Sequence, residues 1–88
     1  MDKIKYLVII KWKDPTYHSN ENVFKKDYDF TIQFTAGMLV KEDKLSIRIA
    51  LNIDDNGNGE YIDIPKSLII KMFKYPIPKQ LGVSKNAD

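Results

Sequence analysis

The segment LSIRIALNI, Leu45–Ile53, alternates apolar side chains with others over its whole length. The apolar set is Leu45, Ile47, Ile49, Leu51 and Ile53, and the set between them is Ser46, Arg48, Ala50 and Asn52. Successive side chains of a β-strand point to opposite faces of the sheet, so a period of two residues is typical of a strand. This segment therefore predicts a β-strand.

The stretch that follows, DDNGNG at residues 54–59, leads into a second apolar alternation, EYIDI at residues 60–64. Two strand patterns that flank Asn-Gly steps predict a hairpin, because both central residues of a type I′ turn need a positive φ. The stretch also matches the first half of a calcium-binding loop. The later ligand positions of that loop fall on Ile62 and Pro65, which offer no side-chain ligand. We therefore interpret the stretch as a turn and expect no metal site.

The segment KIKYLVIIKW, Lys3–Trp12, has one wholly apolar side. That side consists of Ile4, Tyr6, Val8, Ile10 and Trp12. The other side is apolar only in the middle, at Leu7 and Ile9, with lysines around them. β-Branched and aromatic residues favour strands. We predict a strand covered on both faces at its centre, either by a central position in the sheet or by another subunit.

Two further segments complete the expected sheet. In YDFTIQFT, Tyr28–Thr35, the side chains of Tyr28, Phe30, Ile32 and Phe34 face one way, which predicts a half-buried strand with that apolar side inward. Ala36 and Gly37 are expected to break this strand, and Met38–Val40 to form a short edge segment. The polar connection over residues 13–22 is the longest irregular segment.

The segment PKSLIIKMFKY, Pro65–Tyr75, predicts an amphipathic helix, because its apolar residues share one arc at the helical period. Asp63 is the expected N-cap, and Pro76 ends the helix. The expected fold is α+β: a small antiparallel sheet of four to five strands with one C-terminal amphipathic helix packed on one face. We expect residues 1–75 to form a single domain and residues 76–88 to form a tail that is partly packed and then mobile.

The composition excludes several kinds of chemistry. The chain of 88 residues has no cysteine and a single histidine, His18, so it can form neither a disulfide nor a thiolate zinc site. His18 lies in the polar connection with no recognisable nucleophile motif, and we expect no catalytic residue, metal or cofactor. An enzyme built around His18 is the third-ranked alternative. No apolar run approaches the length of a membrane span, so we expect a cytoplasmic protein that binds no membrane.

The leading functional hypothesis is a small non-enzymatic interaction module that binds a macromolecular partner, in the first instance a protein. The expected contact residues on the sheet face are Leu7, Ile9, Met38 and Val40. An apolar strip on a nominally outer face is often an interface in so small a domain. A phage or mobile-element accessory protein that inhibits a host factor would be such a module, working inside a bacterial or archaeal cell. A homodimer is compatible with the same surface.

The alternative is a nucleic-acid-binding protein that uses the basic C-terminal helix and tail. The residues expected to contact nucleic acid are Lys66, Lys71, Lys74, Lys79 and Tyr75. Lysines would contact phosphates and the aromatic ring would stack on a base. The net charge of only +2 gives this alternative little support, and Arg48 is the single arginine.

Overall fold

The computed structural model describes residues 4–15 and 19–79 and folds them into one antiparallel sheet. Its elements are β1 (Tyr6–Pro15), β2 (Phe30–Glu42), β3 (Ser46–Ile53), β4 (Gly59–Pro65), the 3-10 turn η1 (Lys66–Leu68) and β5 (Ile69–Pro76). None of the helical segments in these described ranges has the length and apolar character needed to cross a membrane.

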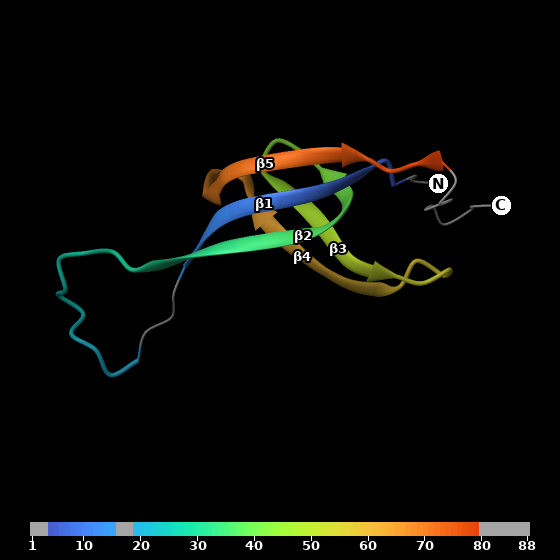
Figure 1. Ribbon diagram of the computed structural model, residues 1–88. Coiled ribbons are helices and arrows are strands. Elements are labelled where there is room, and N and C mark those ends of the chain that lie inside the picture. Colours follow the sequence, from blue (N-terminus) through green and yellow to red (C-terminus); the bar gives the residue numbers. More distant parts are fainter. Residues whose placement is uncertain (1–3, 16–18, 80–88) are drawn as a thin grey trace.

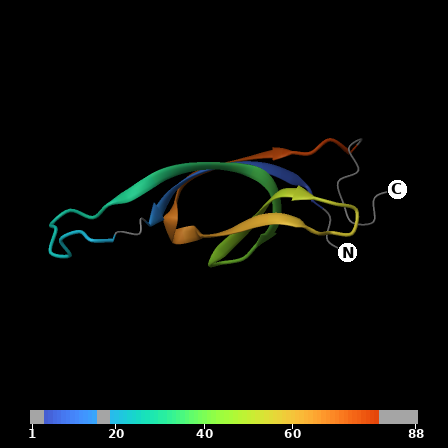
Figure 2. The same ribbon diagram turned by 90° about the horizontal axis from the view of Figure 1, so that it is seen from below.

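The order of the strands across the sheet is β4-β3-β2-β1-β5. The first four strands form a meander, and β5 then returns to pair with β1 on its free side. The sheet curls into two layers, with β5, β1 and the first half of β2 over β3 and β4 (Figures 1 and 2). The edges β4 and β5 are not hydrogen-bonded to each other.

The predicted C-terminal helix is wrong, and with it the α+β fold class. The segment from Pro65 to Tyr75 contains the end of β4, the three-residue turn η1 and most of β5. Its apolar residues fit a helical arc, but Lys71, Phe73 and Tyr75 each lie opposite a residue of β1 as strand residues do. Pairing with β1 decides between the two periods, because β1 would otherwise leave one whole edge of backbone groups unpaired. Asp63, the expected N-cap, instead lies within β4.

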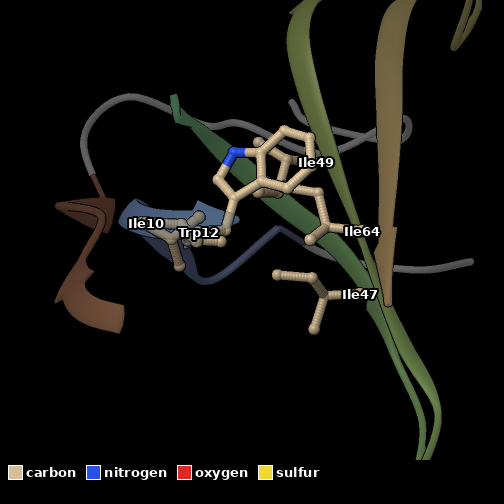
Figure 3. Close-up of a cluster of buried hydrophobic side chains, with 6 residues drawn as sticks. Ile10, Trp12, Ile47, Ile49 and Ile64 are labelled. Carbon is tan, nitrogen blue, oxygen red and sulfur yellow. The ribbon is translucent and has the colours of Figure 1, made fainter. Parts of the chain in front are cut away.

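The hydrophobic core lies between the two layers of the curled sheet. Val8, Ile10 and Trp12 of β1 face Ile47 and Ile49 of β3 and Ile64 of β4, and all six are buried (Figure 3). The alternating sets predicted for the first and third strands are confirmed at these positions. Tyr6, Leu45 and Leu51 are exceptions and are exposed. Leu51 leaves the inner set because a β-bulge between Ala50 and Asn52 shifts the register.

Strand β2 is longer than predicted and runs without a break through Ala36 and Gly37. It pairs with β1 up to Met38 and with β3 from Met38 onward, so it belongs to both layers. Gly37 lies at this junction. A Cβ atom built there would lie 2.5 Å from the carbonyl oxygen of Ala50 and 2.6 Å from Cγ2 of Ile49. The glycine therefore permits the close approach of two strands, and it does not interrupt one.

The predicted hairpin between β3 and β4 is confirmed, but the turn is not a two-residue type I′ turn. Among the described residues of the loop only Gly57 has a positive φ, of 83°. The carboxylate of Asp54 accepts hydrogen bonds from the backbone N–H groups of Asn56 and Asn58, both at 2.9 Å. Asp54 is thus an Asx-turn residue that organises the loop through backbone amides.

Candidate functional site: the outer face of β5, β1 and β2

The side chains of β1 that point away from the core lie in rows with those of its two neighbours. Written in the order β5–β1–β2, the rows are Tyr75–Leu7–Met38, Phe73–Ile9–Ala36 and Lys71–Lys11–Phe34. Lys13 opposite Ile32, and Pro15 opposite Phe30, continue the pattern on β1 and β2. We call this surface the outer face. It is the convex side of the upper layer in Figure 2.

The outer face is apolar and open to solvent. Leu7 is 42% exposed, Ile9 is 45% exposed and Phe34 is 70% exposed. Phe73 and Tyr75 are each about half exposed. Single exposed apolar residues are normal on a protein surface, but a contiguous set across three strands is a candidate contact surface.

Strand β2 exposes the side that its alternation predicts to be buried. Phe30, Ile32 and Phe34 lie on the outer face, so that prediction is wrong. The cause is the pairing register: Phe34 lies opposite Lys11, and β1 already fixes which side is inner through its buried tryptophan. The polar side of β2 turns inward, where the Oγ1 of Thr35 accepts a hydrogen bond of 3.0 Å from Nε1 of Trp12.

Lysine side chains of the outer face lie over its aromatic rings. The Nζ of Lys13 is 4.7 Å from the ring centre of Phe30. The Nζ of Lys71 is 5.1 Å from that of Phe73, and the Nζ of Lys11 is 6.0 Å from that of Phe34. Cations favour the negative face of an aromatic ring. The lysines are thereby held beside the apolar surface.

Three of the four predicted sheet-face residues belong to this site. Leu7 and Met38 are register partners, and Ile9 lies in the next row. Val40 lies apart from them, at the register shift between Leu39 and Lys41. Together with Arg48 and other residues of the β3–β4 hairpin it lines a separate shallow hollow.

The lysines predicted to contact nucleic acid do not form one surface. Tyr75 and Lys71 lie on the outer face, whereas Lys66 and Lys74 both hold the carboxylate of Glu42, each with an N–O distance of 3.0 Å. Lys79 follows β5 and is exposed. The hydrogen bond from Lys74, followed by that from Lys66, lowers the pKa of Glu42. This ion triad ties the end of β2 to η1 and β5.

The guanidinium of Arg48 is paired with a carboxylate on the neighbouring strand of the sheet. Its Nε and Nη2 donate to the two carboxylate oxygens of Asp63 at 2.7 and 3.0 Å, and the guanidinium lies 4.4 Å from the ring centre of Tyr61. The hydrogen bond from Arg48 lowers the pKa of Asp63. This paired arginine makes a cross-strand contact on β3 and β4, away from the outer face.

Within residues 4–15 and 19–79, no three acidic or histidine side chains come close enough together to hold a metal ion. His18 and the alternative built on it lie outside the described residues. Ile77 donates a backbone hydrogen bond of 2.9 Å to Lys5, so the chain just after β5 contacts the chain just before β1.

Four residues of the outer face were not predicted to lie on a contact surface. They are Phe34, Phe73, Lys11 and Lys13. A signal for the lysines was present: they continue the alternating set of Leu7 and Ile9 along the same side of β1. No family model, curated protein or solved structure matches this chain. The fold itself assigns no activity, because one fold can carry many unrelated functions.

Proposed function

We propose that this protein is a non-enzymatic interaction module that binds a protein partner on its outer face. The observation that carries the proposal is the set of exposed apolar side chains that crosses three neighbouring strands. Its centre, formed by Leu7 and Ile9, is aliphatic, and aromatic residues and lysines surround it. An apolar centre with a polar rim is the usual anatomy of a protein–protein contact.

The proposal is tested by panning a displayed library of random peptides on the immobilised protein. Binders are then compared on the variants Ile9→Asp and Leu51→Asp. Leu51 is the matched control, since it is a similarly exposed aliphatic residue on β3, outside the outer face. We expect Ile9→Asp to abolish binding and Leu51→Asp to preserve it. Binders that tolerate Ile9→Asp as well as the wild type would refute the proposal.

Folding of each variant is checked through Trp12, which is buried in the core and whose emission reports its environment. If Ile9→Asp proves unfolded, Phe34→Ala replaces it, because Phe34 is the most exposed large apolar residue of the outer face.

A second candidate function is binding of single-stranded nucleic acid on the same outer face. The observation that favours it is the set of lysines next to exposed aromatic rings, the combination on which bases stack while phosphates are neutralised. Labelled oligo(dT) would then bind at low salt, lose affinity steeply as salt rises, and bind more weakly to Lys11→Glu. Absence of binding at low salt would reject this candidate.

A further inference from the structure

The outer face carries charge of one sign only. Its outward positions on β1, β2 and β5 include Lys11, Lys13 and Lys71, and none of these positions is occupied by Asp or Glu. The outward side of β3 and β4 is different, because Arg48 there is paired with Asp63. The positive charge of the outer face is therefore local and does not reflect the net charge of only +2.

The lysines of the outer face lie unevenly on the two sides of its apolar rows. The two rows centred on Leu7 and Ile9 are apolar across all three strands. Lys11 and Lys13 lie further along β1, and the exposed Lys5 precedes Leu7 in the same alternating set. Successive outward positions on a strand are about 6.6 Å apart. The surface therefore has a basic end, with Lys11, Lys13 and Lys71, and an apolar part beyond which Lys5 follows, spaced at the two-residue repeat of extended chain.

A second copy of this chain fits the surface poorly. Two outer faces packed against each other with their basic ends together would juxtapose lysines, and like charges across an interface are unfavourable. Packed the other way, the lysines of each copy would be buried against the apolar rows of the other, where a charge has no partner. The complementary surface must be acidic beside an apolar part.

The following inference rests on the proposed function. We propose that the partner is an acidic segment of another protein, bound in extended conformation along β1. The side chains of the segment that point toward this protein match the outer face in order. Two apolar residues, two positions apart, contact the rows of Leu7 and Ile9. Carboxylates two and four positions further along lie on Lys11 and Lys13. Charge complementarity of this kind fixes register and orientation and suppresses other partners.

The inference is tested with the peptides selected by library panning that require Ile9. We expect them to contain Asp or Glu two and four positions from an apolar residue. We expect about a tenfold loss of affinity in the triple variant Lys11→Glu, Lys13→Glu, Lys71→Glu. A control that makes the same change of charge elsewhere carries Lys26→Glu, Lys44→Glu and Lys79→Glu, and it should bind these peptides as the wild type does.

The outcomes separate this inference from the proposed function. Peptides that require Ile9 but are neutral or basic, or that tolerate the triple variant, overturn the acidic partner and leave the proposed function standing. If no selected peptide requires Ile9, both fail. Oligo(dT) that competes with the selected peptides for the outer face would overturn the protein partner in favour of nucleic acid. The triple variant must retain the Trp12 emission of the wild type. If it does not, Lys11→Gln alone replaces it, and peptide affinity unchanged in Lys11→Gln overturns the inference.

Discussion

Replacing Gly37 with alanine should destabilise the fold more than any other single added methyl group in β2. The new Cβ would lie 2.5 Å from the carbonyl oxygen of Ala50 and 2.6 Å from Cγ2 of Ile49. The first of these atoms belongs to the backbone of β3, so no side-chain rotation relieves the contact. Forcing extra volume into packed structure typically costs about 1–3 kcal/mol.

The measurement is urea unfolding followed by the emission of Trp12. With a slope near 1 kcal/mol per molar urea, as expected for a domain of this size, the midpoint should fall by about 1–3 M. The control is Ala36→Ser, a change at the neighbouring position on the exposed outer face, where we expect less than about 0.5 kcal/mol. A loss below about 0.5 kcal/mol in Gly37→Ala would show that the two strands do not approach as closely as described.

Three further predictions concern single polar groups. Because lysine contacts lower the pKa of Glu42, they stabilise the fold above its ordinary pKa, and this contribution is lost as the pH falls through the lowered value. Glu42→Gln should therefore cost about 0.5 kcal/mol in urea unfolding at pH 7 and almost nothing near pH 2, and an equal cost at both would contradict the assignment. Thr35→Val removes the acceptor of the Trp12 indole N–H and should lower the unfolding free energy by about 1–2 kcal/mol. Thr35→Ser keeps the hydroxyl and should therefore avoid most of this loss. Asp54→Ala removes two bonds to loop amides and should lower the unfolding free energy by about 1 kcal/mol, while millimolar calcium should leave the wild-type melting temperature unchanged.

The elements with an unambiguous two-residue period were predictable from the sequence. Ile47 and Ile49 are buried as their alternation indicates. The first strand lies between two others as expected, but the predicted cover on its second side is wrong for the described residues, because Leu7 and Ile9 are exposed. In these segments local pattern and tertiary pairing agree.

The last strand was not predictable from local pattern, because the apolar residues of 68–75 fit a helical arc and show no clean two-residue alternation. The decisive interaction is the pairing of β5 with β1, more than fifty residues earlier in the chain, as in the pair Leu7 and Tyr75. No window of neighbouring residues contains that contact, and tertiary pairing overrides local propensity.

The candidate site was predicted in part. Leu7, Ile9 and Met38 were identified because apolar residues on a second side of a strand need a covering partner. Phe34 was assigned to the core, since alternation shows which residues share a side but does not show which side faces inward. Only the pairing register of β2 with β1 determines which side of β2 faces inward.

The pairing of the first strand with the last has a consequence for synthesis. As the chain leaves the ribosome, β1 to β4 can form their meander, but one edge of β1 keeps its backbone groups unpaired until Ile69–Pro76 has emerged. Closure of so long a loop is slow compared with hairpin formation. During that interval the free edge of β1 is available to any other extended chain. The nascent protein therefore exposes the edge of a strand that carries the core residues Ile10 and Trp12 until its final strand is made.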